Sequence, residues 1–171
     1  MVKQLILIVL ACLSSYTLTG QEFSLEVPTD WSFEISSSDI LIAGEDFSGR
    51  YDSPTQQTIG SISGQQPWWD PNHPAHQNQC LNRNRCDWTV QIHKVDLNWH
   101  PNLKLFVKRN GFIPNVNNGT NWQEISDIPL EFFNGTGNTD QIFVQYSFRE
   151  VSVLMDADEY TAQVIYTVST P

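Results

Sequence analysis

Residues 141–170 of the chain read QIFVQYSFREVSVLMDADEYTAQVIYTVST. Apolar and polar residues alternate over both ends of this stretch, which is the period of a β-strand with one buried face. Between them, Val151 and Val153 continue the alternation. The stretch predicts strands near the end of the chain whose apolar side chains face a core: Ile142, Val144, Tyr146, Phe148, Tyr160, Ala162, Val164, Tyr166 and Val168.

The same alternation recurs along the rest of the chain, and no window carries a sustained helical period. Counting the runs gives about eight or nine short strands separated by Gly, Pro and Asn, a pattern typical of β-sandwiches. The predicted fold class is therefore all-β, an immunoglobulin-like antiparallel β-sandwich, with a jelly-roll or barrel as the alternative. Asn110-Gly111, Asn118-Gly119 and Asn134-Gly135 are predicted to form positive-φ turns. The other predicted strands lie near residues 22–27, 31–35, 40–43, 58–62, 88–92, 103–107 and 128–132.

Residues 1–20 have the pattern of a signal peptide. Lys3 precedes an apolar stretch at residues 5–13, and small and polar residues follow it as far as Gly20. The stretch is shorter than the roughly 20 apolar residues that cross a bilayer, so we expect no transmembrane segment. Cleavage before Gln21 predicts a protein that is secreted or held at the cell surface. In an alternative interpretation, Val9-Leu10-Ala11-Cys12 is a lipobox and Cys12 carries a lipid.

Residues 21–171 have the length of a single domain. Residues 65–86 contain three prolines and many Asn and Gln residues, which predicts a long loop. The chain has 19 acidic and 9 basic residues and a formal charge of −10. This charge argues against nucleic acid or an anionic membrane as a partner.

Cys80 and Cys86 lie in the predicted loop and are the only cysteines beyond the signal peptide. An even pair in an exported protein predicts a disulfide bond. His73 and His76, with Cys80 and nearby Asp70, are residue types that zinc or copper binds. Because two prolines of the loop exclude a regular helix that would bring both imidazoles to one side, we predict no metal site and no cofactor.

A cluster of acidic residues, Asp156, Asp158 and Glu159, precedes the last predicted strand. Carboxylates that alternate in a tight turn can bind calcium, but this cluster lacks the full set of oxygen ligands. The alternatives are a weak calcium site and a solvated acidic turn.

Known catalytic patterns are absent or incomplete. The nearest approach to the nucleophile elbow Gly-x-Ser-x-Gly is Gly60-Ser61-Ile62-Ser63-Gly64, which has isoleucine at the position of the nucleophile. No two acids stand out as a pair for glycoside hydrolysis. We predict that the protein is not an enzyme, and a small exported hydrolase with an unrecognised site is an alternative.

Trp68 and Trp69 follow Pro67 in the polar loop. Exposed indoles on a loop can stack on sugar rings, so these two are the candidate ligand-binding residues. The alternative is that they fold back and cover one end of the core. The tryptophans in or beside strand patterns are predicted to lie in the core: Trp31, Trp88, Trp99 and Trp122.

The ending YTAQVIYTVSTP, residues 160–171, resembles the closing strand of exported bacterial surface and pilin-like β-sandwich domains, including the WxL cell-wall-binding family. Trp88-Thr89-Val90 is similar to the Trp-x-Leu element of that family, with valine in place of leucine, and Tyr166 stands where its terminal strand has tryptophan. The bacterial resemblance implies that the acceptor-like Asn118-Gly119-Thr120 and Asn134-Gly135-Thr136 are simple turns.

Together these patterns favour a non-catalytic extracellular module, a surface or pilin-like structural and adhesion protein. The expected partners are other copies of the chain or a cell-surface glycan. A carbohydrate-binding domain that uses Trp68 and Trp69 is the alternative from another functional class.

Overall fold

The computed structural model describes residues 5–13, 22–25, 31–35, 47, 49–55, 57–59, 62–65, 87–139, 141–156 and 158–169. These residues form thirteen strands and no helix, so the prediction of an all-β fold is confirmed. In the described ranges there is accordingly no apolar helix of the length that spans a membrane.

The larger sheet has six strands, and its neighbours are antiparallel except for β1 and β13, which run parallel. The long central pair of this sheet, β13 and β7, stays in register from residue 162 to 169, with a bulge at its start. In spatial order the strands are β3 (Trp31–Ile35), β1 (Leu5–Leu13), β13 (Glu159–Ser169), β7 (Asp87–Asn98), β11 (Leu130–Thr136) and β9 (Val116–Asn117).

The smaller sheet has five antiparallel strands, and β12 lies at its centre. Two further strands form a separate ribbon, β2 (Glu22–Leu25) with β6 (Ile62–Gln65). The order in the smaller sheet is β10 (Gln123–Glu124), β8 (Lys104–Asn110), β12 (Ile142–Arg149) and β4 (Arg50–Asp52), and β5 (Gln57–Ile59) also pairs with β12.

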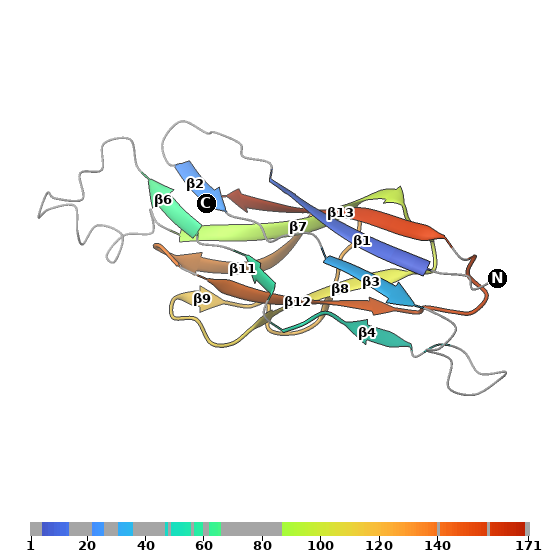
Figure 1. Cartoon of the computed structure of the whole chain (residues 1–171). Coiled ribbons are helices and arrows are strands. Elements are labelled where there is room, and N and C mark those ends of the chain that lie inside the picture. The colour runs from blue at the N-terminus through green and yellow to red at the C-terminus, as the bar shows by residue number, and fades with distance from the viewer. Residues whose placement is uncertain are drawn as a thin grey trace, which may run out of the picture.

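The two large sheets lie face to face, as in a β-sandwich (Figure 1). Trp31 of β3 shows the contact directly, because its indole stacks on Tyr146 and Phe148 of β12, with ring centroids 5.9 and 4.6 Å apart. The core between the sheets contains the apolar residues that the alternation selected on β12 and β13, apart from Val168, which is half-buried at its edge. Burial of these side chains is the main favourable contribution to folding.

Two buried tyrosines also join the sheets. The hydroxyls of Tyr146 on β12 and Tyr166 on β13 lie 2.5 Å apart, at hydrogen-bond distance. Burial raises the pKa of both phenols, so both stay protonated and neutral. Because each hydroxyl satisfies the other, two polar groups are accommodated in the core without an uncompensated desolvation cost.

Local features differ from the sequence predictions at two places. Val151 and Val153 follow the end of β12 in an irregular segment and a turn, where Val151 is buried and Val153 exposed. The prediction of a turn at Asn134-Gly135 is wrong, because both residues lie within strand β11 and Gly135 has no positive φ. Positive φ does occur at Gly111 and Gly119, as predicted for the other two Asn-Gly pairs.

Strand β1 is the segment whose sequence predicts the apolar part of a signal peptide. It pairs with β13 on one side, in a register that joins Ile6 to Glu159 and Leu13 to Tyr166, and with β3 on the other side. This pairing belongs to the uncleaved chain and does not test cleavage, so the signal peptide stays a prediction.

Candidate binding face on the smaller sheet

The outer face of the smaller sheet gathers basic and aromatic side chains. On β8, Leu105 and Val107 are in the core, so the alternating residues between and beside them point away from it. Four of the nine Lys and Arg residues of this acidic chain lie on the outer face. The set is called the cationic face below and consists of Arg50, Lys104, Phe106, Lys108, Trp122 and Arg149.

Three of these cations form one row across three strands. Arg149 of β12 is the Cα partner of Arg50 on β4 and also of Lys104 on β8. Like charges directly opposite one another destabilise a sheet pair. The row therefore requires compensation by aromatic rings, by carboxylates or by a bound anion.

Aromatic rings supply part of that compensation. The guanidinium carbon of Arg149 lies 3.9 Å from the ring centroid of Phe106 and 5.4 Å from that of Trp122. Arg50 and Lys108 approach the same Trp122 ring at 4.9 and 4.8 Å. Cations at these distances are attracted by the negative face of an aromatic ring. Trp122 thus holds three cations around a single half-buried indole.

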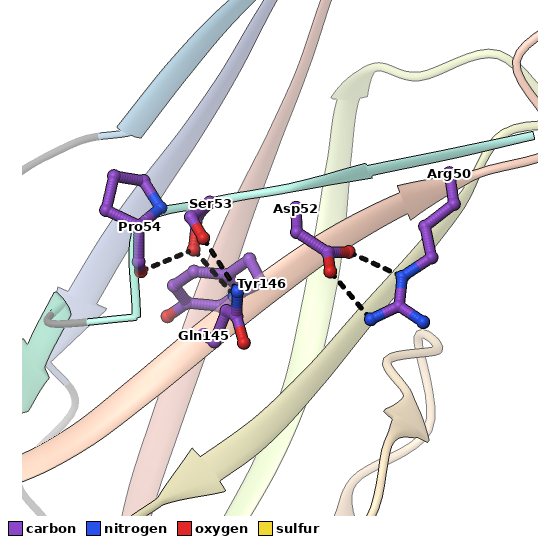
Figure 2. Close-up of polar contacts among 6 residues, drawn as sticks. All are labelled: Arg50, Asp52, Ser53, Pro54, Gln145 and Tyr146. Atoms are coloured by element: carbon purple, nitrogen blue, oxygen red, sulfur yellow. Dashed lines mark hydrogen bonds and ion pairs between the residues drawn. The ribbon is translucent and has the colours of Figure 1, made fainter. Parts of the chain in front are cut away.

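Carboxylates compensate two cations of the row. The guanidinium of Arg50 donates two hydrogen bonds to Asp52, at 2.8 and 2.6 Å (Figure 2). These bonds, which favour the ionised carboxylate, hold the pKa of Asp52 below its usual value. Lys104 forms an ion pair of 2.8 Å with Glu150, and this raises the pKa of Lys104.

Arg149 and Lys108 have no such partner among the described carboxylates. The Nε–H of Arg149 is shielded from solvent and donates to no acceptor in the described part of the chain. Buried donors in proteins normally have an acceptor. The middle of the row is therefore the point where the face has unused hydrogen-bonding capacity.

Strand β4 is fixed to the sheet beyond its own three residues. The backbone N–H of Ser53 donates to Tyr146 O at 2.9 Å. The backbone N–H of Tyr146 donates to Ser53 Oγ at the same distance (Figure 2). The Gln145 side chain donates to Ser53 O at 2.9 Å. These contacts hold Arg50 and Asp52 against the face.

A groove of about 580 Å³ lies beside the cationic face, and Trp122 belongs to both. The groove lies between the segment that leads into β10 and the strand β11, where the Gln123 side chain donates to Glu131 O at 3.1 Å. Its lining combines four amide or hydroxyl side chains, two aromatic rings, one carboxylate and one glycine: Asn118, Gly119, Thr120, Asn121, Trp122, Gln123, Glu131 and Phe132.

The wall of the groove is organised by a buried arginine. Arg109 lies on the core side of β8, and its guanidinium donates to the carbonyls of Asn118, Gly111 and Val116 at 3.1, 3.0 and 3.4 Å. Desolvation lowers the pKa of Arg109. Its guanidinium supplies the hydrogen bonds that water would otherwise donate to these buried carbonyls. Arg109 therefore holds residues 111–119 in place and has a structural role.

The site residues predicted from the sequence lie mostly outside the described residues. This holds for the ligand-binding candidates Trp68 and Trp69, for the disulfide pair Cys80 and Cys86, and for the metal candidates of the same loop. These predictions stay untested. The same is true of lipid attachment at Cys12, which lies in β1.

The acidic cluster before β13 is largely described. Asp158 accepts hydrogen bonds from the backbone N–H of Glu159 at 2.8 Å and from the Asn98 side chain at 3.4 Å. The hydroxyl of Tyr160 donates to the backbone carbonyl of Asp156 at 2.8 Å. Nowhere in the described ranges do three His, Cys, Asp or Glu side chains lie close enough to hold a metal ion. The described atoms of this cluster organise the turn.

The prediction for the tryptophans is confirmed for Trp31 and Trp88, which are buried, and Trp99 packs partly buried against the core. It is wrong for Trp122, which lies on the cationic face. A signal for this face was present in KLFVKRN at residues 104–110, where a period of two places Lys104, Phe106 and Lys108 on one side. Its other members come from distant strands, which the sequence does not align.

Comparison with known proteins gives no match: no protein-family model fits the chain, and no curated protein or solved structure is significantly similar to it.

Proposed function

We propose that the chain is an exported, non-catalytic recognition module with an immunoglobulin-like β-sandwich fold, which acts at the cell surface by binding a glycan at the cationic face and the adjoining groove. The observation that carries this proposal is Trp122, a half-buried indole that lines the groove and contacts three cations. A function of this kind is adhesion.

The dimensions and chemistry of the groove support a sugar ligand. Its volume of about 580 Å³ falls within the roughly 300–1,000 Å³ of typical ligand sites. Amide and hydroxyl groups, such as those of Thr120, Asn121 and Gln123, can exchange hydrogen bonds with sugar hydroxyls. The groove adjoins strands β10 and β11, and the hydrogen bond from Arg109 to the carbonyl of Asn118 holds its loop wall in place, which suits recognition.

The same lining supports a role in binding more than in catalysis. Glycoside hydrolysis uses two carboxylates, whereas Glu131 is the single acid among the described residues that line the groove. A small exported hydrolase would have to place its reacting groups elsewhere.

A glycan array tests the proposal, with the purified exported protein, Trp122→Ala and the double variant Trp68→Ala/Trp69→Ala. We expect the wild type and the double variant to bind the same glycans, and Trp122→Ala to lose binding while keeping its far-UV circular dichroism. If the double variant loses binding and Trp122→Ala keeps it, the site is the loop at residues 65–86. Absence of any glycan ligand for the wild type would refute the function.

Assembly with other copies is the second candidate, and strand β1 favours it. Strand β3 joins the larger sheet only through β1, as far as the described strands go. If the predicted signal peptidase cleavage removes β1, an edge of β13 loses its partner, and unpaired edges accept strands from other chains.

Light scattering of the mature protein, with and without residues 21–27, tests this second candidate. Strand addition between copies predicts concentration-dependent oligomers that the deletion abolishes without unfolding the sandwich. A mature protein that remains monomeric at high concentration, or a deletion variant that unfolds, would make the N-terminal segment part of a self-contained fold.

A further inference from the structure

We infer that the ligand of the cationic face is an acidic glycan, and that one carboxylate of a uronic-acid-type sugar binds between Arg149 and Lys108 while its ring and neighbours occupy the groove. This inference rests on the proposed function, because it names the class of glycan that the site accepts. It follows from the charge arrangement, from an unused donor and from the proximity of the groove.

The charge arrangement is unusual for this chain. Acids outnumber bases 19 to 9, yet three bases stand in one cross-strand row. Asp52 and Glu150 compensate the two ends of the row, and its centre, Arg149, has aromatic contacts alone among the described residues. Like charges in a row are unfavourable, so an anion that binds at the centre would relieve the repulsion.

The anion is expected beside Arg149, the cation of the row that has no carboxylate partner among the described residues. Arg149 Nε is shielded from solvent and makes no hydrogen bond in the described part of the chain. A guanidinium is planar, and its fork of donors matches a carboxylate. Lys108 lies on the same indole, 4.8 Å from the ring centroid, and has no ion pair with a described carboxylate. The two cations without an ion pair to a described carboxylate thus border the same ring.

The groove favours a sugar over an acidic peptide, because its amide and hydroxyl side chains can exchange hydrogen bonds with several sugar hydroxyls. It adjoins the cations through Trp122 and offers short polar side chains at its wall. The limited positive charge also disfavours a polymer with several negative charges on each sugar, since the chain as a whole carries −10 and would repel it. A polymer with one carboxylate per sugar fits both conditions.

Calorimetric titration with polygalacturonate and with its fully methyl-esterified form tests the inference, because the two polymers have the same sugar backbone and differ in whether the carboxyl group is ionised or a neutral methyl ester. We expect the acidic polymer to bind the wild-type exported protein about tenfold more tightly or better, the effect of one charge-assisted hydrogen bond. Arg149→Gln and Lys108→Gln should each remove most of this difference, so that the acidic and the esterified polymer bind each variant with similar affinity. Arg149→Lys, which keeps the charge without the planar fork, should restore part of it.

Lys94→Gln is the matched control. Lys94 also lies over an indole, 5.3 Å from the centroid of Trp99, but it belongs to β7 of the larger sheet and forms an ion pair with Asp96. The substitution changes the net charge by the same amount, so binding of the acidic polymer should stay at the wild-type level. The melting temperature of each variant shows whether the fold is retained.

The outcomes separate the two proposals. Equal affinity for the acidic and esterified polymers would overturn the acidic ligand and leave glycan binding intact, whereas binding to neither polymer nor to any arrayed glycan would overturn both. Equal losses in Lys94→Gln and Arg149→Gln would show a general charge effect and also overturn the inference. Loss of self-association in Arg149→Gln, with no glycan bound, would assign the face to an acidic segment of a second copy.

Discussion

Trp88 and Trp122 present the same indole in opposite surroundings. Trp88 is 1% exposed, meets Phe133 edge-on with ring centroids 6.0 Å apart, and satisfies its N–H by donating to Gly137 O at 2.7 Å. Trp122 is half-buried and has three cations as neighbours. The indole of Trp88 contributes buried apolar area to the core, and the indole of Trp122 holds cationic side chains together on the surface. The difference shows that the residues on neighbouring strands, and not the residue type, determine whether a tryptophan is buried in the core or contacts charged groups at the surface.

The comparison predicts losses of stability of very different size when each indole is removed. Trp88→Ala should lower the free energy of unfolding by about 3–5 kcal/mol, because it leaves a large cavity in the core. Trp122→Ala should lower it by less than about 1 kcal/mol, since exposed cation–π contacts contribute little. Urea denaturation followed by circular dichroism measures both. A Trp122→Ala variant as unstable as Trp88→Ala would mean that the indole belongs to the core and would remove the proposed binding role.

Gly135 lies directly beneath the indole of Trp88, and the absence of a side chain there allows the two to pack closely. A Cβ atom at this position would lie 2.4 Å from Cζ2 of Trp88 and 2.6 Å from the carbonyl oxygen of Asn115. Gly135→Ala should therefore force the indole or the neighbouring backbone to move, at a cost of about 1–3 kcal/mol or more.

Gly49→Ala is the control for this substitution, because nothing lies within 4 Å of a Cβ there and its φ is not positive. Thermal unfolding should show a clear loss of stability for the Gly135 variant and little change for the Gly49 variant. Equal melting temperatures would mean that Trp88 does not pack over Gly135 in solution.

The two regions also show how far sequence reasoning reaches. Alternation identified the buried faces of β7, β8, β12 and β13 because side-chain direction in a strand has a strictly local period of two. The Asn134-Gly135 dipeptide misled, because here glycine is required by the indole that packs on it and not by a turn. That indole belongs to another strand, 47 residues earlier in the sequence.

The cationic face was missed for a related reason. Arg50, Lys104 and Arg149 are far apart in the chain, and only the register of β4, β12 and β8 places them in one row. Local charge patterning showed the β8 members, but a lysine on the exposed side of a strand is common and carries little information by itself. Long-range pairing, which sets the chemistry of this face, has no local sequence signal.

The smallest expected effect concerns the pH dependence of the Trp122 region. The two hydrogen bonds from Arg50 lower the pKa of Asp52 in the folded state below its unfolded value of about 4. A lowered folded-state pKa means that the pair stabilises the fold above the unfolded pKa, and that this contribution is lost as the pH falls through the folded-state pKa. Because the side chains of Arg50 and Asp52 are both partly exposed, loss of their ion pair should lower the free energy of unfolding by less than Trp88→Ala or Gly135→Ala does.

Asp52→Asn isolates this contribution. At pH 7 the wild type should unfold at a slightly higher urea concentration than Asp52→Asn, and the gap should close as the pH is lowered towards 3, because protonation removes the same charge that the substitution removes. Arg50→Gln should reproduce the loss at pH 7, since it removes the other half of the pair. The described contacts of Trp88, with Phe133, Gly135 and the carbonyl of Gly137, involve no ionised group, so the loss of stability in Gly135→Ala should not depend on pH. A gap between wild type and Asp52→Asn that widens at low pH would contradict the ion pair and, with it, the assignment of Asp52 as the carboxylate that compensates Arg50.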